Sequence, residues 1–487
     1  MNKTLSIAGA IALLVSAWLS LPSQTSAATS ANAANSSVAT EADFRDLYKE
    51  LVETNTTASS GSCTLAAERM ANRLKAAGYP AEDFHPFAVP EHPKDGGLVF
   101  VAPGRDPKAK AILLLAHIDV VEAKRADWTR DPFKLVEENG YFYARGVIDD
   151  KAEAAIWVDT LVRYKKEGFK PRRTLKLALT CGEEGGGEFN GAWWLSQNRR
   201  DWIDAEFAVN EGADGELDAQ GNRVALEIQA GEKLAANFQL EVTNPGGHSS
   251  RPLKNNAIYH LAGALKRIEP YEFPAQFTDG NRAYFTAMAK VAAAKGETEV
   301  ANAMNALVKD PNDTAAIALV SSKDPSWNAT LRTTCVATML NAGHAPNALP
   351  QRADANINCR IFPGVPEETV RQKLEELVND PEVKVTTLGN EERSTPPPSL
   401  TPAVMGPFNK LAAKFWPGLP VVPILQPGAT DGRYLNAVGI PTYGIEPLFT
   451  GPDLGHIHGL NEYVGVQSLM QARDFLYQLV KVYADQK

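Results

Sequence analysis

Three short, largely apolar runs, separated by stretches with the length and composition of helices, constrain the fold of this chain most. The runs are Ile112–Leu115, Thr174–Thr180 and Phe207–Val209. Such runs are typical of strands buried on both faces. The stretch Lys151–Lys166 begins after two aspartates, and carboxylates stabilise the free N–H groups of a helix N-terminus. This alternation predicts an α/β domain in three layers, with a mixed, mostly parallel sheet between helices. Further helices are expected at Glu41–Val52, Thr64–Ala77 and Val466–Tyr483.

A different order of elements occupies the middle of the chain. Strand, helix, strand, strand, helix and strand are expected in turn at Leu234–Val242, Asn256–Ile268, Thr333–Leu340, Ala353–Ile361, Glu367–Val378 and Val383–Leu388. This is the order of a ferredoxin-like α+β unit, which can form a domain by itself. We therefore predict a larger domain over residues 40–230 and 396–487, interrupted by a smaller domain over 231–395. An Ala-rich helical insertion is expected near 275–330.

The composition is that of an ordinary globular protein, with 44% hydrophobic and 22% charged residues. A chain of 487 residues exceeds the usual size of one hydrophobic core, so two or three domains are expected. The net charge of −9 argues against a nucleic-acid-binding protein, because such proteins need a basic surface.

The N-terminal segment has the pattern of a secretory signal peptide. Lys3 precedes the apolar run Ile7–Leu19, and small residues follow at Thr25–Ala27. A run of about 13 residues is too short to cross a bilayer comfortably, whereas a charged start and a small-residue cleavage site are typical of export signals. We predict a signal peptide over residues 1–27 and a periplasmic or secreted protein that has no membrane contact after processing. A retained membrane anchor is the alternative.

The four cysteines have neither zinc-finger spacing nor a CxxC motif. Cys335 and Cys359 lie on two expected neighbouring strands, and a disulfide between them is one of the alternatives for an exported protein. Cys63 and Cys181 are expected to be buried thiols. Zinc binding by Cys181 is the less favoured interpretation.

Acidic and imidazole side chains follow the apolar strands at the points where the strands end. The groups are His117-Ile118-Asp119, Glu183-Glu184 and Asn210-Glu211-Gly212, and two further groups are Asp149-Asp150 at a helix start and His456-Ile457-His458 near the C-terminus. In open α/β sheets ligands bind outside the carboxyl ends of the strands, so these side chains are expected to meet in one crevice. Imidazole and carboxylate ligands suit zinc, and also cobalt or manganese. Their number exceeds the needs of one ion and favours two metals that share a carboxylate.

The same groups occur in the order of a known family. Three further motifs accompany them: Gly146-x-x-Asp149-x-Lys151, Gly246-Gly247-His248-Ser249-Ser250-x-Pro252 and His458-x-x-Asn461-Glu462. Together they resemble the aminoacylase, glutamate carboxypeptidase and succinyl-diaminopimelate desuccinylase family of di-zinc exopeptidases. The resemblance covers nearly the whole mature chain and implies a catalytic di-metal domain with an inserted lid or dimerisation domain. It implies two Zn²⁺ per chain, with Co²⁺ or Mn²⁺ as substitutes, and a homodimer formed through the lid.

The resemblance also assigns roles to the residues that match its motifs. The implied metal ligands are His117, Asp149, Glu184, Glu211 and His458, with Asp149 bridging the two metals. Asp119 corresponds to the residue that orients the His117 ring. Glu183 corresponds to the general base, which takes a proton from the metal-bridging water and passes it to the leaving nitrogen.

Several assignments are secondary or leave an alternative. His248 resembles an oxyanion donor that reaches the site from a neighbouring subunit, and Asn347 and Arg360 resemble a clamp on the substrate carboxylate. Gly428 begins a segment that resembles a substrate-backbone loop. His456 is the alternative to His458 as a ligand. The remaining expectations are a helix-capping role for Asp150 and structural roles for His85, His92, His260 and His344.

The predicted function is therefore that of an exported metal-dependent exopeptidase or amidohydrolase, which cleaves a small peptide or an N-acyl amino acid. Glu211 slightly favours the carboxypeptidase and acylase members, because dipeptidase-like members tend to have Asp at that position. One alternative is a metal-dependent binding protein that has lost catalysis, against which the intact Glu183 argues. The other is a di-metal phosphoesterase, for which the chain has no clear basic or Gly-rich phosphate cradle.

Overall fold

The structure is a computed structural model that describes residues 40–185, 189–389, 394–426 and 428–487. The predicted signal peptide lies outside the described residues. Within those residues, no helix combines the length and the hydrophobicity that a membrane span requires.

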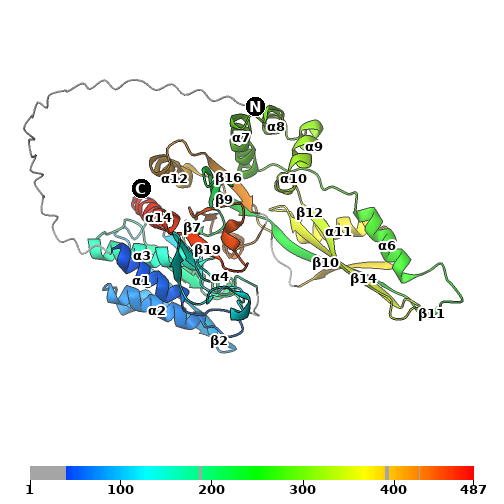
Figure 1. The fold of residues 1–487 in the computed structure, drawn as a ribbon, viewed down its shortest axis with the longest axis horizontal. Coiled ribbons are helices and arrows are strands. Elements are labelled where there is room, and N and C mark those ends of the chain that lie inside the picture. The colour runs from blue at the N-terminus through cyan, green and yellow to red at the C-terminus, as the bar shows by residue number, and fades with distance from the viewer. Residues whose placement is uncertain (1–39, 186–188, 390–393, 427) are drawn as a thin grey trace, which may run out of the picture. The chain divides into compact units, whose positions relative to one another are not determined.

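A ten-stranded mixed sheet forms the centre of the larger domain (Figure 1). Its strands are β1 (Phe84–Val89), β2 (His92–Ala102), β3 (Ile112–His117), β6 (Leu175–Thr180), β7 (Phe207–Asn210), β8 (Gly215–Leu217), β9 (Arg223–Glu232), β16 (Val421–Gln426), β17 (Thr442–Gly444) and β18 (Phe449–Thr450). The order is β1-β2-β6-β3-β7-β17-β9-β8-β18, and β16 pairs with β9. The three apolar runs of the sequence form β6, β3 and β7, which are neighbours and parallel. Their carboxyl ends therefore lie at one edge of the sheet.

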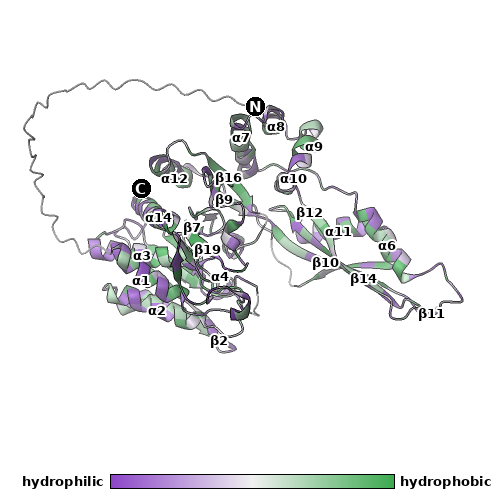
Figure 2. Ribbon diagram, in the orientation of Figure 1, coloured by the Kyte–Doolittle hydropathy of each residue, from purple (hydrophilic) through white to green (hydrophobic). Residues whose placement is uncertain are grey.

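Helices cover both faces of this sheet, because alternate residues of a strand point to opposite faces. Leu114 of β3 packs in a core with α1 (Glu41–Val52), α2 (Cys63–Ala76), α3 (Lys151–Glu167), α12 (Pro402–Phe415) and α14 (Val466–Asp485). Leu115 packs in a second core with α4 (Gly191–Asn198), α5 (Arg200–Ile203) and α13 (Gly432–Ala437). Figure 2 shows hydrophilic and hydrophobic residues on α1 and α2, as expected for helices that cover a core with one face. A small sheet of β4 (Val136–Glu138), β5 (Tyr141–Tyr143) and β19 (Tyr463–Gly465) completes the domain.

The inserted lid is a four-stranded antiparallel sheet with two helices. Its elements are β10 (Leu234–Thr243), α6 (Ala257–Ile268), β12 (Thr334–Ala342), β14 (Arg352–Ile361), α11 (Glu367–Val378) and β15 (Val383–Leu388). The strand order β12-β14-β10-β15 is that of a ferredoxin-like unit. Side chains on one face pack with α6 and α11 in a hydrophobic core. A separate two-stranded ribbon, β11 (Gly247–His248) with β13 (Ala348–Leu349), follows the end of β10.

The predicted insertion is helical and has a hydrophobic core of its own. It consists of α7 (Asp279–Ala294), α8 (Thr298–Lys309), α9 (Thr314–Lys323) and α10 (Pro325–Leu331). Phe285, Met304 and Leu307 are fully buried within it. Helix α7 also packs against β16 of the larger sheet.

A buried lysine lies where the chain passes from the larger sheet into the lid. Lys233 connects β9 to β10 and is 1% exposed. Its Nζ donates to the carbonyl oxygens of Ala329 at 2.9 Å and Arg332 at 2.8 Å, and to Thr334 Oγ1 at 3.3 Å. The same ammonium therefore ties the first strand of the lid to the segment that leads into β12.

All four cysteines form disulfides, so the prediction of buried thiols at Cys63 and Cys181 was wrong. Cys63 begins α2 and Cys181 follows β6, and the two are bonded across 118 residues of sequence. Packing of α2 beside the end of β6 brings the two sulfurs together, which no local spacing reveals. Cys335 and Cys359 lie opposite each other on β12 and β14 and form the second disulfide, the pairing that the strand positions had offered.

Candidate metal centre and active site

The structure brings all five predicted metal ligands together at the carboxyl edge of the larger sheet. His117 Nε2 lies 2.9 Å from Asp149 Oδ1 and 3.8 Å from Glu211 Oε1. His458 Nε2 lies 2.9 Å from Asp149 Oδ2 and 2.8 Å from Glu184 Oε2. The two oxygens of Asp149 therefore face two different imidazoles, which is the arrangement that a carboxylate bridging two cations requires.

The carboxylates around the two imidazoles favour positive charge at this site. Burial lowers the pKa of His117, but hydrogen bonds to Asp119 and Asp149 outweigh burial and raise the pKa well above its ordinary value. Hydrogen bonds to Asp149 and Glu184 raise the pKa of His458 to about 10. A cation among the same atoms would neutralise the same negative charge.

The donor set fits divalent metal ions. Two groups of side chains each bring their ligand atoms within 4.8 Å of one another: His117 with Asp149 and Glu184, and His117 with Glu183 and Glu211. Glu184 Oε1 is buried, and no described residue donates a hydrogen bond to it. Imidazole nitrogens and carboxylate oxygens are the usual ligands of catalytic zinc. The described residues thus offer nitrogen and oxygen donors of the kind that two divalent ions would need.

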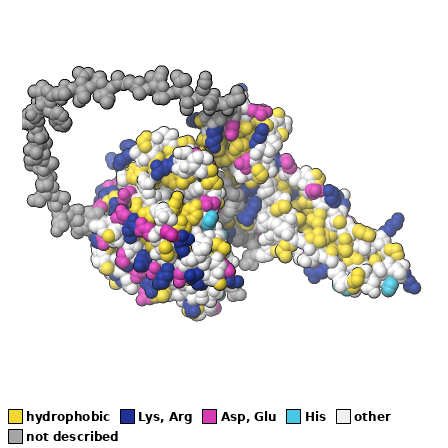
Figure 3. All heavy atoms as spheres, viewed as in Figure 1, with side chains coloured by type: hydrophobic (Ala, Val, Ile, Leu, Met, Phe, Trp, Pro, Cys, Tyr) yellow, Lys and Arg dark blue, Asp and Glu magenta, His cyan; other side chains and the backbone are white. Residues whose placement is uncertain are grey.

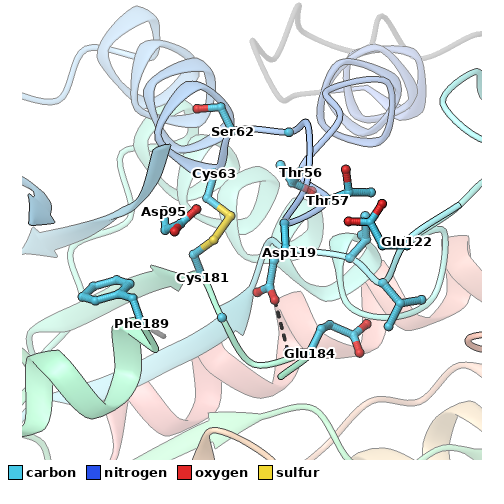
Figure 4. Close-up of a pocket in the computed structure, with 15 residues that line it drawn as sticks. Thr56, Thr57, Ser62, Cys63, Asp95, Asp119, Glu122, Cys181, Glu184 and Phe189 are labelled. Atoms are coloured by element: carbon cyan, nitrogen blue, oxygen red, sulfur yellow. Dashed lines mark hydrogen bonds between the residues drawn. A yellow bond between two sulfur atoms is a disulfide. The ribbon is translucent and has the colours of Figure 1, made fainter. Parts of the chain in front are cut away.

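Asp119 positions both the imidazole and the two neighbouring glutamates. Its Oδ1 lies 3.5 Å from Nδ1 of His117, as a residue that orients the ring should. Its carboxylate also accepts hydrogen bonds from the backbone N–H groups of Glu183 at 3.4 Å and Glu184 at 3.1 Å. Figure 4 shows the bond to Glu184 beside the Cys63–Cys181 disulfide. Asp119 therefore fixes the loop that follows β6, a role that its position in the sequence does not indicate.

Glu183 has the surroundings of a proton-transfer group. Burial is the largest cause that raises its pKa to about 8, and the charges of Asp431, Asp149 and Glu184 contribute while His117 opposes them. A carboxyl group that titrates near neutral pH can accept a proton and return it. Glu183 also lies within ligand distance of His117 and Glu211, so its assignment as base rather than ligand stays a prediction.

A buried ion pair that sequence reasoning missed holds His458 in place. Arg145 Nη1 donates to Glu462 Oε2 at 2.6 Å, and Glu462 also accepts from the backbone of Gly146 and Ile148, both at 3.1 Å. Arg145 Nη2 donates to the carbonyl oxygen of His458 at 3.3 Å. The pair thus connects the loop before Asp149 with the loop of His458. Glu462 stands in one of the sequence motifs and Arg145 directly precedes another, but their pairing depends on the fold.

Two expectations about neighbouring residues are settled by the contacts. Asp150 occupies the N-cap position of α3, but its side chain makes no capping bond, so the predicted capping role was wrong. It is fully buried and its Oδ2 accepts from the backbone N–H of His117 at 3.2 Å instead. His456 Nδ1 lies 3.2 Å from the carbonyl oxygen of Leu460, and its Nε2 lies 3.3 Å from Asp453 Oδ2. His458, rather than His456, therefore lies with the other predicted ligands.

The predicted lid residues do not form one group within a single chain. Arg360 pairs with Ala235 at the start of β10. His248 lies in β11, beyond the other end of β10, where it pairs with Ala348 next to Asn347. A strand of ten residues spans about 30 Å. Arg360 and the pair of His248 and Asn347 are thus at opposite ends of the lid sheet.

The segment that contains Gly428 follows β16 and lies at the edge of the metal centre. Its Thr430 Oγ1 accepts from Asn210 Nδ2 at 3.3 Å, directly before Glu211. Its Asp431 accepts from Thr180 Oγ1 at 2.8 Å, at the end of β6. The segment is therefore anchored to the same strand ends that carry the glutamates.

Known proteins are similar to this chain in sequence. The model of peptidase family M20/M25/M40 matches residues 113–482. N-fatty-acyl-amino acid synthase/hydrolase PM20D1 of Mus musculus is 30% identical over 79% of this chain and 76% of its own length. Aminoacylase-1A of Rattus norvegicus is 25% identical over 79% of this chain and 83% of its own length.

Solved structures agree in fold. The M20 family metallo-carboxypeptidase Sso-CP2 from Sulfolobus solfataricus superposes with a TM-score of 0.67 at 18% identity, covering 91% of this chain and 99% of that one. YXEP of Bacillus subtilis, described as a dinuclear metal binding peptidase, gives a TM-score of 0.56 at 12% identity, covering 91% and 97%. The resemblance inferred from the motifs is confirmed, and the protein is an enzyme of the metallopeptidase and amidohydrolase type. The chain belongs to peptidase family M20/M25/M40.

Proposed function

We propose that this protein is an exported di-zinc hydrolase that cleaves the amide bond of a small peptide or an N-acyl amino acid. The observation that carries the proposal is the position of Asp149, whose two oxygens face His117 and His458 at 2.9 Å each. His117 and Glu211 would hold one ion and His458 and Glu184 the other. When bound, the ions would polarise the amide carbonyl and lower the pKa of the attacking water.

The residues of the chain would supply positioning and proton transfer. Glu183 would accept a proton from the attacking water and donate it to the leaving nitrogen, a contribution of roughly 10²–10⁴-fold. Asp119 keeps Glu183 in place by accepting a hydrogen bond from the backbone N–H of Glu183. The adjacent pair Glu183 and Glu184 fits this reaction, because one carboxylate would bind metal while its neighbour stays free to transfer a proton.

The substrate would be an acyl amino acid with a free carboxylate. Arg360 of one subunit and Asn347 of its neighbour are the proposed clamp for that carboxylate, since a guanidinium suits a carboxylate by shape and charge and the two residues lie at opposite ends of one lid. The relatives support this substrate class, because one is named for N-fatty-acyl-amino acids and another is an aminoacylase.

A dimer through the lid would bring His248 of one subunit to the site of the other. Strand β12 is an edge of the lid sheet and exposes Val336, Met339 and Leu340, each 59–63% accessible. Hydrophobic side chains gather over the lid in Figure 3. An exposed apolar edge strand favours pairing with another copy. The separation of His248 from Arg360 within one lid agrees with action across a dimer.

Export is proposed from the signal-like N-terminus. Two disulfides, Cys63–Cys181 and Cys335–Cys359, agree with an oxidising compartment.

A product-release assay tests the proposal. Zinc-loaded protein is incubated with dipeptides, N-acyl amino acids and N-blocked peptides, and free amino acids are quantified. We expect release from at least one class of substrate with a free C-terminal carboxylate. No release from any of them, by protein shown to contain two zinc ions per chain, would contradict the proposed function.

A further inference from the structure

A cavity of about 600 Å³ borders the metal centre, and we call it the acidic cavity. Two of the proposed metal ligands, Asp149 and Glu211, form part of its wall. The rest of the wall comes from the larger domain, including β8, β9 and β16 and the segment after β17. This volume is within the range of pockets that bind small molecules.

Carboxylates beyond those of the metal centre line the acidic cavity. They are Asp214, Glu216, Glu227 and Glu446, and none of the described lining residues is a lysine, arginine or histidine. Thr450 Oγ1 donates to Asp214 Oδ2 at 2.9 Å. Burial raises the pKa of Asp214 to about 6. Burial, with the charges of Asp214 and Glu216, raises the pKa of Glu227 to about 8. Burial and mutual repulsion thus oppose ionisation of these acids, and a cation in the cavity would favour their charged forms.

Glu446 gives independent evidence for a ligand. Its side chain is only 8% exposed, and its Oε1 meets no hydrogen-bond donor among the residues that the structure describes. A buried carboxylate oxygen without a donor is costly. Since Glu446 lines the cavity, a cation that enters the cavity would lie close to this carboxyl group and stabilise its charged form.

The spacing of these carboxylates does not suit a further metal ion. In the described part of the chain, the groups whose ligand atoms lie close enough to share an ion include none of Asp214, Glu227 and Glu446. The wall also contains aliphatic side chains, among them Ile148, Ile424 and Ile457. Apolar walls with separated carboxylates suit an organic cation, whose stem packs on the wall while its head reaches the oxygens.

We propose that the acidic cavity binds a cationic group in the acyl half of the substrate, namely an ammonium or guanidinium at the end of an aliphatic stem. This inference rests on the proposed function, from which it takes the position of the scissile amide at the metal centre. The carboxylate of the leaving amino acid is repelled by the cavity, so that half of the substrate lies outside it and the acyl half points in. An uncharged fatty acyl chain would instead cover the carboxylates without pairing them, which is unfavourable.

Two ligands that differ in one charge test the inference by equilibrium binding. The probes are ε-aminohexanoyl-alanine and heptanoyl-alanine, in which a methyl group replaces the ammonium. Calorimetry with the zinc-loaded Glu183→Gln protein measures both without turnover. We expect the cationic probe to bind at least ~10-fold more tightly, as for a charge that gains a desolvated partner.

Variants test which side chains cause the preference for the cationic probe. Glu446→Gln, made in the same background, should reduce the ratio of the two dissociation constants several-fold, and Asp214→Asn serves as a second variant if Glu446→Gln does not fold. Glu122→Gln is the matched control, because Glu122 is an exposed carboxylate that bonds to Ser59 and does not line the acidic cavity. The control should leave the ratio unchanged.

The outcomes separate this inference from the proposed function. Equal binding of the two probes, or a preference that Glu122→Gln reduces as much as Glu446→Gln does, would overturn the inference. A second pair of probes, acetyl-lysine and acetyl-norleucine, carries the difference in charge on the leaving amino acid. If the protein prefers the cation in this pair but not in the first pair, the inference is also overturned. If wild-type enzyme cleaves both probes without preference, only the inference fails. If it binds the cationic probe selectively but releases an amino acid from no substrate class tested, the cation preference of the cavity stands and the proposed function fails.

Discussion

The two main sheets of this protein bury different kinds of side chain. At the carboxyl edge of the larger sheet, His117 and Glu462 are 1% exposed, and buried oxygens of Asp150, Glu153 and Glu184 have no donor among the described residues. The lid core consists of hydrophobic side chains. Polar residues of the lid sheet bond to one another: Asn356 and Asn358 both donate to Asn237 Oδ1, at 3.1 Å and 3.0 Å.

This difference separates a region adapted to binding from a region adapted to packing. Buried charges without partners cost free energy, whereas a hydrophobic core stabilises by itself. The edge of the larger sheet should therefore depend on cations for its stability, and the lid should not.

Metal removal should have the largest effect. A chelator should abolish hydrolysis, and zinc at 1,000 times its dissociation constant should restore about 4 kcal/mol of stability. Hydrogen exchange should show β3 losing protection on chelation while β14, as the internal control, keeps it. Equal loss of protection in both strands would contradict the proposal that only the larger sheet depends on cations for its stability.

Loss of one ligand should remove one ion. Glu184→Ala or His458→Ala should lower the zinc content towards one per chain, because each of these side chains contacts the other near Asp149. Elemental analysis of purified protein measures the content, with activity falling in parallel. A wild-type protein that never holds more than one ion after reconstitution would contradict the two-metal site.

Glu183→Gln should retain the fold and the metal but lose at least ~10²-fold in kcat. Turnover and zinc content are measured on the same preparation. Near-normal turnover would place the proton transfer elsewhere. Loss of metal would instead show that Glu183 is a ligand and that the roles of Glu183 and Glu184 are exchanged.

His248→Ala should reduce kcat by ~10²–10³-fold with little change in metal content, since it would remove one donor to the developing oxyanion. Mixing His248→Ala subunits with Glu183→Ala subunits tests whether His248 acts across a dimer. If it does, subunit exchange creates one site with both residues intact and activity returns. A mixture as inactive as its parts would assign His248 to its own chain.

The two disulfides should have the smallest effects on turnover, and they sharpen the comparison. Loop-closure entropy predicts a loss of about 5 kcal/mol on removing Cys63–Cys181 and about 3 kcal/mol on removing Cys335–Cys359, because the bonds close loops of 118 and 24 residues. Paired Cys→Ala variants are compared by thermal unfolding and by kcat. Only the first pair should lower kcat, a few-fold, since Cys181 precedes the Glu183–Glu184 loop. An equal effect of the two pairs on kcat would argue against that positioning role.

The parts of the fold that depend on local pattern were predictable. The apolar run at Ile112–Leu115 became β3, and the alternating segment at Ala353–Ile361 became β14, because burial follows the periodicity of each strand. The metal-centre residues were predictable because each stands at a strand end or in a motif.

The remaining features arise from contacts between distant segments. Arg145 meets Glu462 across 317 residues, and Cys63 meets Cys181 through the packing of α2 on the sheet. Asp150 turns away from its helix because the backbone N–H of His117 lies beside it. Glu446 has no neighbour in the sequence that indicates a cavity. No local spacing in the sequence indicates any of these features, because each depends on how distant segments pack in three dimensions.

The buried Lys233 has a mechanical consequence. The chain enters the lid at Lys233, between β9 and β10, and returns to it at Thr334, after the helical insertion. Without a contact between them, these two segments could move independently. The side chain of Lys233 donates to three acceptors in the segment before and at the start of β12. This contact makes the two connections one joint, in which a displacement of either is transmitted to the other. His248 lies beyond the other end of β10, so the residue proposed to act on a neighbouring site is in the part of the lid remote from this joint.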